Sequence, residues 1–96
     1  MKIDFIKDGD ALKVSLDGRL DTLTALIFED FLKDNLASVN AMTIDCEKLS
    51  YVSSAGLRVL LSAQKKMLTG LKLINVCELV MEVFEITGFV DVLTIE

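Results

Sequence analysis

The alternation of apolar and polar residues at the start of the chain predicts two antiparallel strands. Residues 3–6 and 12–16 largely alternate apolar with polar side chains, as in strands with one buried face. Between them, the segment 7–10 reads Lys-Asp-Gly-Asp and supplies the turn residues of a hairpin. Asp17 and Gly18 are expected to end the second strand.

Apolar residues at helical spacing follow a capping signal. Asp21 or Thr22 can cap a first helix, because each side chain offers an oxygen to unpaired backbone N–H groups. Leu26 falls among charged residues and is expected on the polar face. The residues that we expect to face the core are Leu23, Ile27, Phe28, Phe31 and Leu32.

The rest of the chain alternates strands with helices. Strands are predicted at residues 42–46, 71–76 and 92–95, with a loop at 47–50, and helices at 54–68 and 78–86. Thr69-Gly70 and Thr87-Gly88 are expected to end these two helices. Their inward residues are expected to be Leu57, Leu60, Leu61, Ala63, Met67, Leu68, Leu79, Val80, Val83 and Phe84.

The resulting order, ββαβαβαβ, predicts an α/β fold. Alternating strands and helices give a mostly parallel sheet, and a helical crossover joins parallel strands with a right-handed link. We expect one domain over residues 1–96, with a mostly parallel five-stranded sheet, an N-terminal antiparallel hairpin and three helices. This length suffices for one hydrophobic core.

The junction of the third strand and the second helix carries two adjacent serines. Ser53 and Ser54 fall at a helix N-terminus, where unpaired N–H groups and the helix dipole favour an oxygen or an anion. Either serine could simply be the N-cap. Because ligands and partners meet the carboxyl ends of parallel strands, we expect both hydroxyls at an accessible edge.

Composition narrows the range of functions. A net charge of −5 argues against nucleic-acid binding. No apolar run is long enough to span a bilayer, and the first residues form a strand pattern where a signal peptide would be apolar. We therefore expect a cytoplasmic protein without direct membrane insertion.

The residues that most often carry catalysis are missing. The chain has no histidine and only two cysteines, which excludes a histidine-activated nucleophile and a structural zinc site. Its glycines are scattered, so no phosphate-binding loop is present. We expect no catalytic residue, metal or cofactor, and we expect Cys46 and Cys77 to be buried, reduced thiols.

Several residues near the serines suit a protein interface. Arg19, Lys48 and Arg58 could pair with a phosphate or an acidic partner, although such residues are more often just solvated surface charges. Three apolar residues near the same turn would favour a protein partner if exposed: Leu26, Leu49 and Val52.

With these residues in view, the sequence resembles the STAS domain, the fold shared by bacterial anti-sigma factor antagonists and the cytoplasmic tails of sulfate transporters. The resemblance covers nearly the whole chain and is most specific at segment 52–57, Val-Ser-Ser-Ala-Gly-Leu. Antagonists usually carry an aspartate, the phosphorylated serine, a second hydroxyl residue, glycine and leucine there. In this chain the phosphorylatable position is Ser54, the aspartate position is Ser53 and the second hydroxyl position is Ala55.

The resemblance implies a partner-switching mechanism. The unmodified domain would bind an anti-sigma factor with serine kinase activity; phosphorylation of Ser54, or alternatively Ser53, would release it, and a serine phosphatase would restore it. The partner-binding residues would be Asp21, Thr22, Leu49, Val52, Ser53, Ser54, Gly56, Leu57 and Arg58. The alternative is a STAS subunit that is never phosphorylated and braces a larger assembly, such as a lipid-transporting ABC complex.

Overall fold

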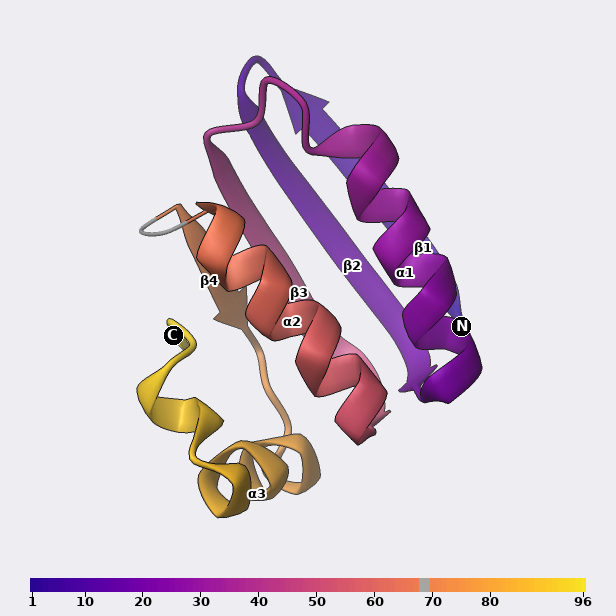
Figure 1. The fold of residues 1–96 in the computed structure, drawn as a ribbon, viewed down its shortest axis with the longest axis vertical. Coiled ribbons are helices and arrows are strands. Elements are labelled where there is room, and N and C mark those ends of the chain that lie inside the picture. The colour runs from indigo at the N-terminus through magenta and orange to yellow at the C-terminus, as the bar shows by residue number, and fades with distance from the viewer. Residues whose placement is uncertain (68–69) are drawn as a thin grey trace.

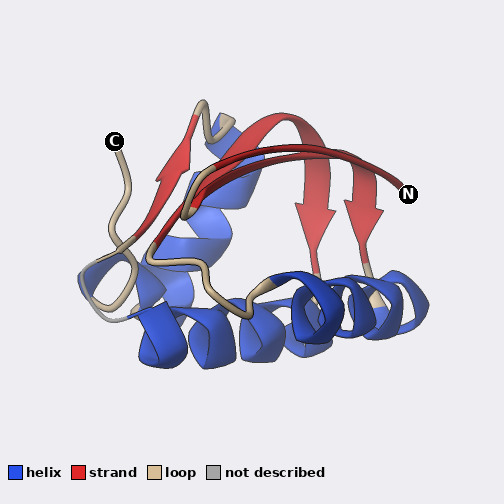
Figure 2. Ribbon diagram, turned by 90° about the horizontal axis from the view of Figure 1, so that it is seen from above, coloured by secondary structure: helices blue, strands red, loops and turns tan. Residues whose placement is uncertain are grey.

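A four-stranded mixed sheet with two helices packed on one face forms the framework of the chain (Figures 1 and 2). The computed structural model describes residues 1–67 and 70–96. In the sheet, β1 pairs antiparallel with β2, and β3 and β4 follow in parallel, in the order β1-β2-β3-β4. The strands are β1 (Lys2–Asp8), β2 (Ala11–Leu20), β3 (Ala41–Val52) and β4 (Leu71–Ile74).

The helices provide the crossovers between the parallel strands. The first, α1 (Thr22–Asn35), connects β2 to β3, and α2 (Ser54–Met67) connects β3 to β4. The chain ends with α3 (Glu78–Thr87) and the short 3₁₀ helix η1 (Phe89–Asp91). The predicted hairpin, three helices and parallel crossover are confirmed, and Gly88 ends α3 with φ +80°. The predicted helix end at Thr69 and the inward position of Leu68 lie outside the described residues.

The predicted fifth strand is wrong. After Gly88 the chain turns into η1, and the N–H groups of Val92 and Leu93 donate to the carbonyl of Phe89 at 3.0 and 2.8 Å. These donors are therefore not available to a neighbouring strand. Only Ile95 forms a bridge, to Leu73, among the residues at this end of the chain that the structure describes.

Two strands are longer than the pattern indicates. Asp17 and Gly18 do not end β2, because register shifts beside them absorb the irregularity and pairing with β3 continues to Leu20. The expected loop at 47–50 is also wrong, since β3 continues through it to Val52. Pairing across the sheet therefore overrides local turn signals in both strands.

The buried stripe of α1 is rotated relative to the prediction. Ala25, Phe28 and Leu32 face the sheet, whereas Leu23 and Ile27 are exposed. The small Ala25 permits close packing of the helix, and Phe31 at the margin of the stripe meets Phe5 of β1, with ring centroids 5.0 Å apart. Leu26 is exposed, as predicted.

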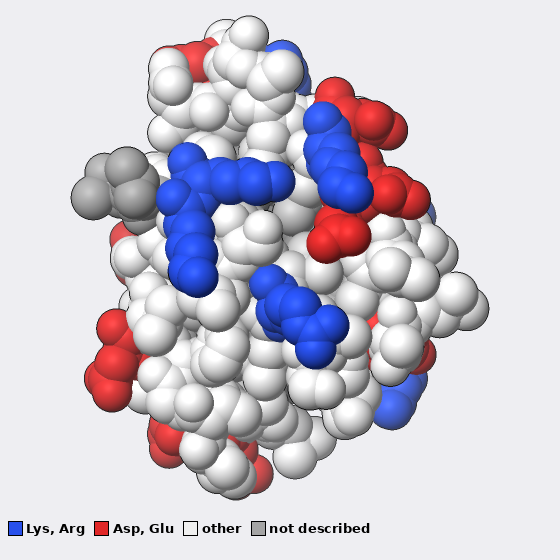
Figure 3. Space-filling model, in the orientation of Figure 1, with Lys and Arg blue, Asp and Glu red and all other residues white. Residues whose placement is uncertain are grey.

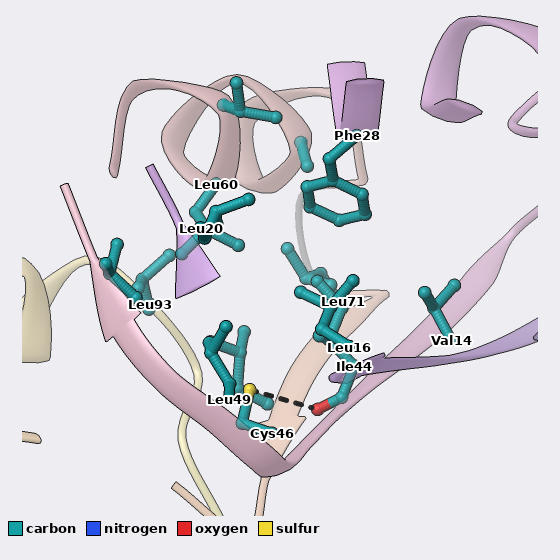
Figure 4. Packing of buried hydrophobic residues seen from close by; sticks show 14 of the residues in the cluster. Val14, Leu16, Leu20, Phe28, Ile44, Cys46, Leu49, Leu60, Leu71 and Leu93 are labelled. Atoms are coloured by element: carbon teal, nitrogen blue, oxygen red, sulfur yellow. Dashed lines mark hydrogen bonds between the residues drawn. The ribbon is translucent and has the colours of Figure 1, made fainter. Parts of the chain in front are cut away.

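The core is a layer of aliphatic and aromatic side chains between the sheet and the helices. Figure 4 shows Phe28 and Leu60 from the helices above Ile44 and Leu71 from the strands. Cys46 lies in this layer as a free thiol, and burial raises its pKa to about 12; Cys77 is free and half-buried. Leu61, Met67 and Val83, expected inside, are half-buried, and Leu79 is exposed.

No helix in the described parts of the chain is both long and apolar enough to cross a bilayer.

Candidate functional site

The carboxyl ends of β2 and β3 bring the starts of α1 and α2 together, at the lower end of both helices in Figure 1. Leu20 pairs with Val52 in the sheet, and the N–H of Ser53 donates to the carbonyl of Leu20 at 2.8 Å. Asp21 and Ser53 therefore follow two paired strand ends. We call residues 52–55 the serine turn.

The two serines have different local roles. The Ser53 hydroxyl accepts from the N–H of Gly56 at 3.2 Å, and its carbonyl accepts from the N–H of Leu57 at 2.9 Å, so Ser53 is the N-cap of α2. Ser54 is the first residue of the helix and is exposed. Its hydroxyl forms no hydrogen bond with any residue that the structure describes. The turn thus presents one engaged and one available hydroxyl.

Replacing Ser53 and Ser54 separately should distinguish these roles. Ser53→Ala removes the cap and is expected to lower the free energy of unfolding by about 1 kcal/mol. Ser54→Ala removes an exposed, unengaged hydroxyl and should leave that free energy within about 0.5 kcal/mol of the unmodified protein. Urea denaturation of both variants measures the difference, and equal losses would contradict the assignment of the cap.

Gly56 allows α2 to start directly against the end of β2. A Cβ at this position would lie 2.8 Å from Cγ of Leu20 and 2.9 Å from its carbonyl oxygen. Backbone atoms cannot move aside cheaply, so a side chain here would displace the first turn of α2. Gly56 and the buried Leu57 therefore position the serine turn from beneath.

Asp21 organises the other half of the site. It is the N-cap of α1, and its carboxylate accepts from the N–H groups of Thr24 and Leu23 at 3.0 and 3.2 Å. The hydrogen bonds from the Thr24 backbone and hydroxyl lower the pKa of Asp21. Thr22, the first residue of the helix, is exposed beside the cap. The predicted choice between Asp21 and Thr22 is resolved in favour of Asp21.

Acidification should weaken the fold through Asp21. The pKa of Asp21 is lower in the folded chain than in the unfolded chain, so the ionised carboxylate stabilises the fold. This stabilisation is fully present above the unfolded pKa of about 4 and is lost as the pH falls through the lowered, folded-state value. Asp21→Asn can still cap but cannot titrate in this range, so it should lose less thermal stability on acidification. Melting temperatures between about pH 7 and about pH 3 test this, and an identical pH dependence would contradict it.

The three candidate cations lie in different surroundings. The Arg19 guanidinium stacks over the ring of Tyr51, 4.2 Å from its centroid, immediately before the serine turn. Arg58 is exposed one helical turn after Ser54. Lys48 lies opposite Asp17 in the backbone register of β2 and β3. At about 3.3 Å per strand residue, it is roughly 16 Å along β3 from Ser53. The structure therefore brings Arg19 and Arg58, but not Lys48, to the turn.

Leu49 and Val52, which would favour a protein partner if they were exposed, are buried. Each side chain is only 2% exposed, because β3 continues through this segment and turns both residues into the core. They can shape the site from beneath but offer no apolar surface. Exposed hydrophobic residues at this end include Leu23 and Leu26 of α1 and Tyr51 of β3. Leu26 was recognisable from its place among charged residues, whereas Leu23 matched the inward spacing and was missed.

Comparison with known proteins adds a family and a fold. The family model described as "Mlab, STAS domain" matches residues 3–94. No curated protein matches the sequence significantly. An anti-sigma factor antagonist from Mycobacterium paratuberculosis has a similar structure, with a TM-score of 0.86 and 21% identity, covering 98% of this chain and 83% of that one.

Two structures of SpoIIAA have the same fold. The anti-sigma factor antagonist SpoIIAA in its unphosphorylated form has a TM-score of 0.83 and 18% identity, covering 99% of this chain and 88% of that one. The Bacillus cell fate determinant SpoIIAA in the phosphorylated form has a TM-score of 0.74 and 17% identity, covering 99% and 91%. At these identities the likeness establishes the fold alone.

Proposed function

The chain belongs to the STAS domain family, and from this premise we propose that it is an anti-sigma factor antagonist switched by phosphorylation of Ser54. In its unmodified form it binds an anti-sigma factor that has serine kinase activity, and the bound sigma factor is displaced. The kinase then uses ATP to modify Ser54, which releases the antagonist, and a serine phosphatase reverses the modification. This exchange takes place in the cytoplasm.

One observation carries the proposal: the Ser54 hydroxyl is exposed and unengaged, while Ser53 does the capping. A kinase can reach Ser54 without breaking a hydrogen bond of the fold. The antagonists' aspartate is replaced here by Ser53, but aspartate and serine are both strong N-caps, so this departure keeps the local geometry. The Ser53 hydroxyl is a less suitable acceptor because it is already bonded to Gly56.

A phosphate at Ser54 would be tolerated by the domain but not by a partner packed on it. It adds about 1.5–2 negative charges and three acceptor oxygens, which the N-terminus of α2 favours. Inside a desolvated interface the same charge disrupts binding. The accessible binding surface comprises Asp21, Thr22, Ser53, Ser54 and Arg58, supported from beneath by Leu49, Val52, Gly56 and Leu57.

The test is phosphorylation by the cognate anti-sigma factor kinase with ATP, followed by mass-spectrometric mapping. We expect modification at Ser54, loss of modification in Ser54→Ala and its retention in Ser53→Ala. Failure to modify either serine would overturn the proposal. Modification of Ser53 alone would show that the accessible hydroxyl is not the acceptor.

A second candidate is a STAS subunit that braces a larger assembly, such as a lipid-transporting ABC complex, without being phosphorylated. Two observations favour it: the matching family model carries the description Mlab, and the antagonists' aspartate is absent before Ser54. Co-purification with an ATPase, and equal binding of that ATPase by Ser54→Asp, would support the brace. Loss of anti-sigma factor binding by Ser54→Asp would support the switch.

A further inference from the structure

The outer side of α2 carries only positive charge, although the whole chain has a net charge of −5. Arg58, Lys65 and Lys66 are exposed, and the helix contains no acidic residue. None of the three forms an ion pair with residues 1–67 or 70–96. Figure 3, which looks onto α1 and α2, shows basic side chains over α2, whereas acidic ones gather over α1.

An apolar groove runs beside these cations, along the seam between α1 and α2. Its wider part has a volume of about 200 Å³ and is lined by Ala25, Leu26, Ala55 and Val59, with Arg58 at its rim. The seam continues past Val59 toward Lys66. The acidic residue at the rim, Glu29, is already paired with Lys33 at 3.9 Å. The groove can therefore accept an aliphatic side chain next to Arg58, which forms no ion pair within the described residues.

The complementary surface is on α3 of the same chain. Leu79 and Ile86 are 68% and 85% exposed, and their spacing of seven residues places them on one face, about 10 Å apart. Glu78, Glu82 and Glu85 are exposed around them, and α3 contains no Lys or Arg. Acidic side chains mark the lower left of Figure 3, where Figure 1 places α3. This helix thus presents two aliphatic side chains framed by negative charge.

From this complementarity we propose that the chain associates with itself head to tail, α3 of one copy docking in the α1–α2 groove of the next. Ile86 fills the groove, while Glu82 and Glu85 meet Arg58 and Lys66. The two surfaces lie on different elements, so the contact is heterologous. A short chain of copies therefore has a free groove at one end and a free α3 at the other. The proposal does not depend on the function proposed above.

Sedimentation velocity of the purified protein tests the association, because no other molecule is needed. The weight-average mass should rise with protein concentration at about 50 mM salt and return to that of the monomer at about 500 mM, where ionic contacts are screened. A monomer at every concentration in low salt overturns the proposal. Association that does not respond to salt also overturns it.

Charge reversal tests which surfaces meet. Arg58→Glu with Lys66→Glu, and separately Glu82→Lys with Glu85→Lys, should each abolish association, and mixing the two variants should restore it. Asp4→Lys with Asp8→Lys is the matched control for the Glu82 and Glu85 variant: it makes the same change in net charge on β1, at the opposite edge of the sheet, and should still associate. A mixture that stays monomeric, or a control that loses association, overturns the proposed contact.

An uncharged substitution tests the apolar part of the contact. Ile86→Ser leaves every charge in place and changes an exposed side chain, so folding should be unaffected. We expect the association constant to fall about ten- to hundredfold, from loss of one buried aliphatic side chain. The exposed Ile6 of β1 provides the control, since Ile6→Ser should leave the constant unchanged. Equal constants for Ile86→Ser and the unmodified protein would overturn the docking of α3.

Discussion

Replacing Phe28 with alanine is expected to lower the free energy of unfolding by about 3–5 kcal/mol, the cost of removing a buried phenyl ring and leaving a cavity. Phe28 is fully buried and stacks on Phe31 with ring centroids 6.4 Å apart. It holds α1 against the sheet and hence beside α2. Guanidinium denaturation, with the slope compared as well as the midpoint, measures the loss.

Ile27 is the control for this prediction, because it precedes Phe28 in the same helix and is 50% exposed. Ile27→Ala should lower the free energy of unfolding by about 1 kcal/mol or less. The hydrophobic pattern placed both residues inside. If the two substitutions cost the same, the rotation of α1 described above is incorrect.

Phosphorylation of Ser54 is expected to weaken binding of the proposed anti-sigma factor by five- to hundredfold, from a contact energy on the order of 1–3 kcal/mol. The phosphate introduces charge where the partner must exclude water. Ser54→Asp should reproduce part of the loss, and Ser54→Ala should bind nearly as well as the unmodified protein. Calorimetric titration of the three proteins measures the affinities.

A charge elsewhere on α2 separates a local effect from general repulsion. Ser62 lies two turns beyond Ser54 and is half-buried on the same helix. Ser62→Asp adds the same charge away from the turn and should change the affinity by less than about threefold. If Ser62→Asp weakens binding as much as Ser54→Asp, the serine turn is not the point of contact.

The local parts of the fold could be read from the sequence because short-range chemistry determines them. Alternation and turn residues predict the β1-β2 hairpin, and Asp21 signals the start of α1 by its ability to cap. The serines at the strand-to-helix junction could be located in the same way. The sequence does not reveal which serine is the cap and which has a free hydroxyl, because a shift of one residue in the start of α2 would exchange their roles.

The errors arise where distant segments decide the outcome. Leu49 looked like a loop residue, yet pairing of β3 with β2 keeps the segment extended and buries the side chain. Residues 92–95 are apolar or β-branched, as in a strand, but the turn at η1 uses the backbone donors of Val92 and Leu93 that pairing would need. Ile27 has helical spacing, yet the small Ala25 sets which face of α1 meets the sheet.

Because both the hydroxyl and the carbonyl of Ser53 are tied into the first turn of α2, Ser54 has its orientation only in the folded domain. A short peptide with the same amino-acid sequence would not keep that turn, since short isolated helices are marginally stable in water. An enzyme that modifies Ser54 would therefore recognise topography rather than a linear consensus. Its choice of substrates would follow the shape of the domain, even where the residues next to the serine differ between substrates.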